Sequence, residues 1–190
     1  MGNLSPQRNA RSLREVLAGL GSVEQCRATV QWAIENHRVI DVFGDFAKER
    51  HLIVFQSGSE YENWLDPIGN VLYKMNTLNH VGGDLAKLLD RVNLYNELFP
   101  ETAMRLVGVQ VMSRSSVFPI FSQPFVVNSR FATREEIVEY MQARGFEPTD
   151  EDGKFTNSRL LLWDIKPKNV LIAKDGTMFV IDAEIDELEV

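Results

Sequence analysis

The chain reads Asp164-Ile165-Lys166-Pro167-Lys168-Asn169 at the segment that is most informative about its fold. Apolar residues follow at 170–172 and again at 178–181, and Asp182 comes next, thirteen residues after Asn169. The residues between the two apolar runs, 174–177, include an Asp-Gly pair, which is typical of a tight hairpin turn. We therefore expect two short β-strands whose hairpin brings Asn169 and Asp182 to the same end.

These side chains suit phosphoryl transfer. A departing γ-phosphoryl group carries charge that Mg²⁺ neutralises, and the acceptor hydroxyl must be oriented and relieved of its proton. Asp164 would face the acceptor, and Lys166 would lie beside the transferring phosphate. Asn169 and Asp182 would bind Mg²⁺, a hard cation that takes carboxylate and amide oxygens. The alternative, a surface turn with scattered charges, fits each residue singly but not the four spacings together.

The segment resembles the catalytic and metal-binding loops of the protein kinase superfamily. That motif runs Asp-x-Lys-x-x-Asn, then a hairpin, then the Asp of Asp-Phe-Gly, and Asp164, Asn169 and Asp182 match its intervals without a gap. The sequence departs from it at Leu162-Trp163, where the superfamily has His-Arg, and at Ala183-Glu184, where it has Phe-Gly. The resemblance implies ATP and Mg²⁺ as cofactors.

Three strand-like runs, over 52–55, 61–65 and 71–75, match the opening sheet of a kinase N-lobe. The loop between the first two would cover the ATP phosphates, with the backbone amides of Gly58 and Ser59 facing a phosphate. The resemblance places Lys74 where a lysine grips the α- and β-phosphates. The alternative is a solvent-exposed strand lysine.

Apolar residues recur at helical spacing over 83–99, and Pro100 closes the segment. It resembles the kinase helix whose acidic residue pairs with the strand lysine. Asp90 and Glu97 are seven residues apart and share a helix face, so either could reach Lys74. We favour Glu97 because its side chain is longer, although a solvated helix face remains an alternative for both.

The remaining segments complete the expected order of elements. Strands are predicted over 105–112 and 117–121, followed by a hinge at 122–126 that would contact adenine through Gln123 and Phe125. Thr133 and Glu136 form a capping box for a helix that ends near 144–145. A polar, turn-rich stretch and a strand over 159–163 lead into the catalytic loop.

Two helices are predicted at the N-terminus, over residues 10–20 and 23–36, from apolar residues that include Leu13, Val16, Leu17, Leu20 and Val23. Gly21-Ser22 separates them. They would form a helical cap, as simple cover for the domain or as a docking surface for a partner.

Composition limits the function classes. A net charge of −7 and a sequence pI of about 5.0 argue against a nucleic-acid-binding protein. Cys26 is the single cysteine, which excludes an internal disulfide and favours a cytoplasmic location. No apolar stretch approaches the roughly 20 residues of a membrane span, so we expect no membrane partner.

We predict an α+β, protein kinase-like fold with an antiparallel N-lobe sheet and helix and a truncated, rudimentary C-lobe. The expected domains are an N-terminal helical extension (1–45), the N-lobe and hinge (46–126) and the truncated C-lobe (127–190). The chain ends eight residues after Asp182, so we expect no activation segment and no peptide-docking helical subdomain. Over about residues 50–185 it is similar to the compact kinase-like domain of polyvalent proteins of phages and conjugative elements.

The expected function is a minimal ATP-dependent phosphotransferase that moves the γ-phosphate of MgATP to an unidentified hydroxyl on a protein or small molecule. The alternative is a catalytically weak pseudokinase or a nucleotide-binding interaction module. A metal hydrolase is disfavoured because His37, His51 and His80 show no ligand spacing.

Overall fold

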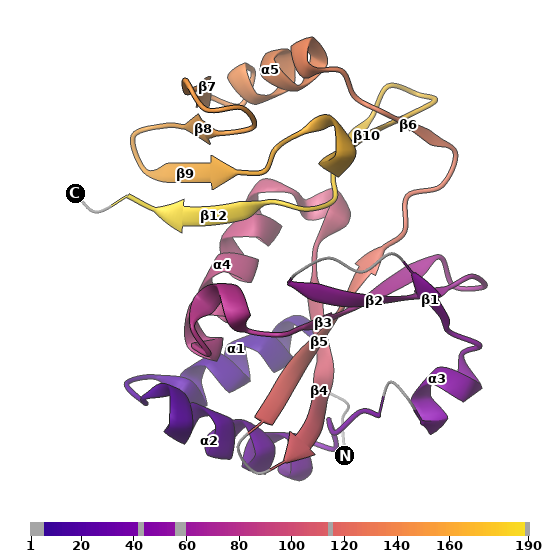
Figure 1. The fold of residues 1–190 in the computed structure, drawn as a ribbon, viewed down its shortest axis with the longest axis vertical. Coiled ribbons are helices and arrows are strands. Elements are labelled where there is room, and N and C mark those ends of the chain that lie inside the picture. The colour runs from indigo at the N-terminus through magenta and orange to yellow at the C-terminus, as the bar shows by residue number, and fades with distance from the viewer. Residues whose placement is uncertain (1–5, 42–43, 56–59, 114–115, 189–190) are drawn as a thin grey trace. The chain divides into compact units, whose positions relative to one another are not determined.

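A computed structural model describes residues 6–41, 44–55, 60–113 and 116–188. Within these ranges the chain is α+β, with antiparallel sheets and five α-helices (Figure 1). It divides into two compact units, which are described separately. Unit 1 comprises residues 1–92 and 104–125, and unit 2 comprises residues 93–103 and 126–190.

Unit 1 contains a five-stranded sheet and the N-terminal helices. Its elements are α1 (Pro6–Leu17), α2 (Ser22–Glu35), α3 (Asp45–Glu49), β1 (Ile53–Phe55), β2 (Tyr61–Asp66), β3 (Val71–Asn76), the 3-10 helix η1 (Asn79–Val81), β4 (Arg105–Ser113) and β5 (Ser116–Pro124). Helix α4 (Leu85–Leu98) begins in unit 1 and ends in unit 2.

The sheet of unit 1 has the strand order β1-β2-β3-β5-β4, so β3 lies at its centre. One face buries a cluster of Trp64, Met75 and Ile120. The predicted strands are confirmed, but β5 is longer than expected. It extends through Pro124 because residues 122–124 continue to pair with β3, where the sequence suggested that an irregular hinge had already begun.

The two N-terminal helices are confirmed, although α1 begins and ends earlier than predicted. They pack against β4 and β5 (Figure 1). Leu13 and Leu17 are fully buried, whereas Val16, Leu20 and Val23 are exposed. The apolar face of this helical pair is therefore narrower than its sequence pattern indicates.

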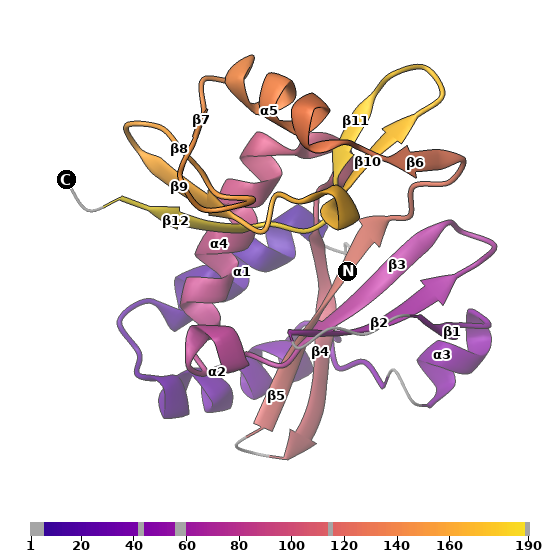
Figure 2. The same ribbon diagram turned by 45° about the horizontal axis from the view of Figure 1, so that its top comes forward.

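Unit 2 contains two small sheets. Its elements are the C-terminal part of α4, η2 (Pro100–Thr102), β6 (Ser129–Phe131), α5 (Arg134–Gln142), β7 (Glu147–Pro148), β8 (Phe155–Thr156), β9 (Leu160–Trp163), η3 (Pro167–Asn169), β10 (Val170–Ala173), β11 (Met178–Val180) and β12 (Glu184–Glu187). One sheet has the order β11-β10-β6 and the other β12-β9-β8-β7 (Figure 2).

Helix α5 starts where its sequence predicts and ends at Gln142, two residues before the predicted end near 144–145. Thr133 accepts a hydrogen bond from the Glu136 N–H, and the Glu136 carboxylate accepts one from the Thr133 N–H, which completes the capping box. After the helix, Gly145 has a φ of 80° and lets the Phe146 N–H bond back to the Met141 carbonyl.

Two features of unit 2 differ from expectation. The turn-rich stretch before the catalytic loop contains the two-residue strands β7 and β8, and the chain re-enters a sheet after Asp182 as β12. Only Ile185 of β12 is buried, so this strand shows no alternating apolar pattern that could have revealed it. No helix in the described part of the chain is long and apolar enough to cross a membrane.

Candidate active site

The loop that carries Asp164 leaves β9 and returns to β10 through the 3-10 turn η3. Asp164 has a φ of 56°, in the left-handed region that aspartate tolerates better than most residues. Its main-chain oxygen accepts hydrogen bonds from the Lys166 N–H at 3.0 Å and from the Asn169 side chain at 2.9 Å. The tight turn at Asp164 is therefore stabilised by later residues of the same loop.

The amide of Asn169 is oriented by Asp164. Its Nδ2 donates to the Asp164 carbonyl at 2.9 Å and to Asp164 Oδ2 at 2.8 Å, and Asn169 is only 8% exposed. Both acceptors are oxygens, so the nitrogen must face Asp164 and Asn169 Oδ1 must face elsewhere. Oδ1 is therefore the atom of this amide that can coordinate a cation.

Two lysines of the loop contact the Asp164 carboxylate. Lys166 Nζ lies 3.3 Å from Oδ1, and Lys168 Nζ lies 3.0 Å from Oδ2. Partial burial of Asp164 opposes its ionisation, but the hydrogen bonds from Lys168 and then Lys166 outweigh it and lower the pKa of the Asp164 carboxyl below its usual value. Asp164 is therefore a carboxylate at neutral pH. The role of Lys168 was not anticipated from the sequence.

Gly153, in the turn between β7 and β8, supports the same loop. Its carbonyl accepts the Ile165 N–H at 2.9 Å. Gly153 has a φ of 73°, and a Cβ at this position would lie 2.6 Å from Lys166 Cγ. Only glycine allows the Lys166 stem to pass this close, a requirement visible in the sequence only as one glycine in a polar stretch.

Asp182 lies in the short link between β11 and β12, and two strand pairings fix the ends of this link. On one side, the Ile181 N–H donates to the Asn169 carbonyl at 2.9 Å. On the other side, Glu184 lies opposite Trp163, the residue before Asp164. The expected hairpin over 170–180 is thus confirmed, and the backbone brings positions 164, 169 and 182 to one end of unit 2.

The end of β11 is held by two buried hydroxyl groups. Tyr95 Oη donates to the Val180 carbonyl at 2.6 Å, and Thr102 Oγ1 donates to the same oxygen at 2.5 Å. Tyr95 is 1% exposed and Thr102 is fully buried. Val180 precedes Asp182 by two residues, so these contacts restrain the backbone that carries Asp182. In the sequence, Tyr95 is one of the residues in the apolar helical pattern over 83–99, and nothing there indicates a role for its hydroxyl group.

In unit 1, Lys74 occupies the central strand β3, opposite Asn63 of β2 and Phe121 of β5. It is only 5% exposed, and its Nζ lies 5.2 Å from the centre of the Tyr61 ring. The alternative of a solvent-exposed strand lysine is therefore wrong. An ammonium group buried on a central strand is costly to desolvate, so its position is one that requires compensating polar or aromatic contacts.

Of the other residues predicted to contact the nucleotide, some lie within the described residues and some do not. Gly58 and Ser59 lie outside the described residues. Gln123 is buried in β5 opposite Leu72, and the Phe125 N–H donates to the Asn70 carbonyl at 2.9 Å. The side chain of Glu97 is exposed.

Asn169 and Asp182 are the residues that the sequence predicted as ligands of Mg²⁺. An amide and a carboxylate fit a cation that retains several waters and also binds phosphates. The part of the chain that the structure describes contains no cluster of three or more His, Cys, Asp or Glu side chains arranged to hold a metal. The residues present suit Mg²⁺ delivered with a nucleotide, which brings its own phosphate ligands.

A family described as serine/threonine/tyrosine kinases found in polyvalent proteins matches residues 24–187. The chain belongs to this family. No curated protein and no solved structure gives a significant match. The predicted relationship to the kinase-like domain of polyvalent proteins is confirmed, and membership of a kinase family implies ATP as the phosphate donor.

The matched region of this kinase-family chain includes the whole catalytic loop and β12, but it begins after α1. The departures from the general protein kinase motif now have structural positions. Trp163 ends β9, and the ring of Trp163 lies 5.5 Å from Lys154 Nζ. Glu184 begins β12 and pairs with Trp163, so both departures lie on the same pair of strands.

Proposed function

We propose that this kinase-family protein is a minimal ATP-dependent phosphotransferase that moves the γ-phosphate of MgATP to a hydroxyl acceptor. The observation that carries the proposal is the contact of Asn169 with Asp164. It holds the Asp164 carboxylate in place and turns Asn169 Oδ1 away from Asp164, which supports roles for the first group with the acceptor and for the second with Mg²⁺. Because phosphoryl transfer depends mainly on positioning and charge stabilisation, pre-arranged groups of this kind are what catalysis requires.

Each residue has a defined task in this proposal. Asp164 orients the acceptor hydroxyl and accepts its proton, and its lowered pKa keeps it ionised for this task. Lys166 neutralises charge on the transferring phosphoryl group. Asn169 Oδ1 and the Asp182 carboxylate bind Mg²⁺, which neutralises charge on the phosphates when it is bound. No step requires a covalent enzyme intermediate.

Lys74 would hold the α- and β-phosphates of the nucleotide, and Gly58 and Ser59 would contribute backbone amides to them. Glu97 is the proposed acidic partner of Lys74, because both carboxylate oxygens of Asp90, the other candidate, are bound by Arg14. Gln123 and Phe125 would recognise adenine through main-chain groups. The Phe125 N–H is already bonded to Asn70, so its carbonyl is the group proposed for this contact.

The test of the proposed function is phosphate transfer from γ-labelled ATP, followed as labelled protein and as released phosphate. Asp164→Asn should lower turnover by about 10²- to 10⁴-fold, the usual contribution of a general base, and leave MgATP binding nearly unchanged. Background turnover in both parent and variant, with MgATP still bound, would instead identify a nucleotide-binding module without transferase activity.

A further inference from the structure

The register of β2 and β3 places Tyr61 diagonally beside Lys74. Lys74 lies opposite Asn63, and Tyr61 precedes Asn63 by two residues on the same strand, so both side chains are on one face of the sheet. Aromatic and long side chains can reach each other across such a diagonal. Lys74 Nζ lies 5.2 Å from the centre of the Tyr61 ring, which is within the range of a cation–π contact.

Both partners of this contact are shielded from water. Lys74 is 5% exposed and Tyr61 is 8% exposed. A cation–π contact is stronger between desolvated groups than at an exposed site. The ring is neutral, so it compensates part of the lost hydration of the ammonium group without cancelling its charge. That charge therefore stays available for a ligand of opposite sign.

Tyr61 is itself restrained at the start of β2. The carbonyl of Glu60, the residue before it, accepts the Thr77 N–H at 3.0 Å and the Thr77 hydroxyl at 3.3 Å. The ring of His80 in η1 lies 6.4 Å from the Tyr61 ring, centre to centre, and His80 Nε2 lies 3.7 Å from Glu60 Oε2. These contacts restrain the backbone and the ring, so the ring offers Lys74 a fixed surface.

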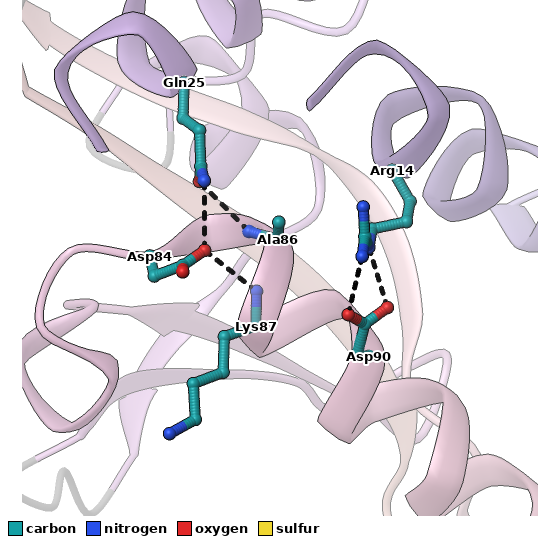
Figure 3. A network of polar contacts seen from close by, with 6 residues as sticks. All are labelled: Arg14, Gln25, Asp84, Ala86, Lys87 and Asp90. Atoms are coloured by element: carbon teal, nitrogen blue, oxygen red, sulfur yellow. Dashed lines mark hydrogen bonds and ion pairs between the residues drawn. The ribbon is translucent and has the colours of Figure 1, made fainter. Parts of the chain in front are cut away.

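Asp90, the acidic candidate that lies in unit 1, is engaged by a different residue. Arg14 of α1 donates to it by two hydrogen bonds, Nε to Oδ1 at 2.7 Å and Nη2 to Oδ2 at 2.9 Å (Figure 3). Paired bonds of this kind hold a carboxylate in one direction. Glu97, the other candidate, belongs to unit 2. The Tyr61 ring is therefore a partner that unit 1 supplies to Lys74 from its own sheet.

We propose that Tyr61 is a positioning residue for Lys74, and that its ring holds the ammonium group in the direction needed to receive the α- and β-phosphates. This inference rests on the proposed function, in which Lys74 binds these phosphates. Fixing a flexible lysine side chain in advance removes part of the entropy cost of binding. Because the contact is made by the face of the ring, phenylalanine should replace Tyr61, whereas an aliphatic residue should not.

The test combines MgATP titration with proton NMR of the lysine ε-methylene groups in the full chain, where Lys74→Met identifies the Lys74 signal. Protons held over an aromatic ring resonate upfield, so the parent should show an upfield-shifted Lys74 signal. Tyr61→Leu should remove this shift and weaken MgATP binding by about tenfold. Tyr61→Phe should keep the shift and most of the affinity.

Tyr73→Leu is the matched control. Tyr73 adjoins Lys74 on β3 but lies on the other face of the sheet, where its ring packs edge-on against Phe46 with the ring centres 5.2 Å apart. This variant loses the same kind of ring and should leave the Lys74 signal and MgATP affinity unchanged. Tyr61→Leu combined with Lys74→Met should bind MgATP no more weakly than Lys74→Met alone, because Tyr61 acts through Lys74.

The inference would be overturned by a Lys74 signal that is the same in the parent and Tyr61→Leu, or by an MgATP affinity that Tyr61→Leu leaves unchanged or raises. A further loss of affinity in the double variant would also overturn it, since Tyr61 would then act by a route other than Lys74. A parent protein that binds no MgATP would overturn the proposed function instead. In that case loss of the upfield shift in Tyr61→Leu would still support the hold of Tyr61 on Lys74, and an unchanged shift would refute it.

Discussion

Asn169 donates both of its amide hydrogens to Asp164, one to the main-chain oxygen and one to the carboxylate. This pair links the two ends of the catalytic loop. These bonds restrain the loop, and they direct the amide oxygen of Asn169 away from Asp164. Much of the proposed chemistry depends on this single relationship.

Asn169→Asp should make folding stability depend on pH in a way that the parent does not. The variant places a second carboxylate where the amide lay 2.8 Å from Asp164 Oδ2. Like charges this close raise the pKa of one group, so the folded variant binds a proton more tightly than the unfolded chain does. Its stability relative to the parent should fall as pH rises from about 4 to 7. Thermal unfolding measured across this range should show a widening gap, and a constant gap would contradict the contact.

Lys168→Ala should raise the pKa of Asp164. Burial already opposes ionisation of this carboxyl, and Lys168 is the leading contributor among the groups that favour its charged form. In the folded parent the lowered pKa of Asp164 stabilises the protein at pH values above the ordinary pKa of aspartate, and this stabilisation is lost as the pH falls through the lowered pKa. With a higher pKa, the variant should lose it at a higher pH than the parent. Carbon NMR titration of the Asp164 carboxyl measures the shift. Lys174→Ala, in the exposed β10–β11 turn, is the control and should leave the titration unchanged.

The sequence predicted the parts of this fold that have local signals. The hairpin over 170–180 has an Asp-Gly turn, α5 has a capping box, and α4 has a strong apolar period, and all three are present. Asp164 and Asn169 could be predicted as site residues because both lie in one short segment with a characteristic spacing.

The features that were missed depend on contacts between distant segments. Arg14 and Asp90 are 76 residues apart, and Tyr95 lies 85 residues from Val180. The spacing of apolar residues along the sequence predicts local secondary structure, but it does not predict hydrogen bonds between such distant residues. Strand β12 was missed because most of its residues are charged. It is a strand because it pairs with β9, and its own sequence has no apolar pattern that would predict this.

Tyr95→Phe should destabilise the protein by about 1 kcal/mol, the usual net contribution of one hydrogen bond. Thr102 still donates to the Val180 carbonyl in this variant. Tyr95→Phe combined with Thr102→Val removes both donors from that buried carbonyl, and we expect a cost of roughly 2–3 kcal/mol with weaker MgATP binding. Denaturant unfolding and nucleotide titration check these values. A double variant that matches Tyr95→Phe in both measurements would show that Val180 does not need these donors.

Gly153→Ala and Gly176→Ala form a matched pair. Both glycines have positive φ, 73° and 88°, so alanine should cost about 1–2 kcal/mol of stability at either site. A Cβ at Gly153 also collides with Lys166, whereas one at Gly176 meets nothing within 4 Å. Phosphate transfer should therefore fall only in Gly153→Ala. Equal turnover in the two variants, at equal stability, would remove Gly153 from the support of the catalytic loop.

The most direct test of the central claim is thermal unfolding of the full chain with ATP, with and without Mg²⁺, in the parent and in Asp182→Asn. The account predicts that MgATP at about 100 times its dissociation constant stabilises the parent by roughly 2.7 kcal/mol, that ATP without Mg²⁺ stabilises it much less, and that Asp182→Asn loses the Mg²⁺-dependent part. A parent protein that unfolds at the same temperature with and without MgATP would contradict the claim that Asp182 and Asn169 bind a nucleotide-held metal ion.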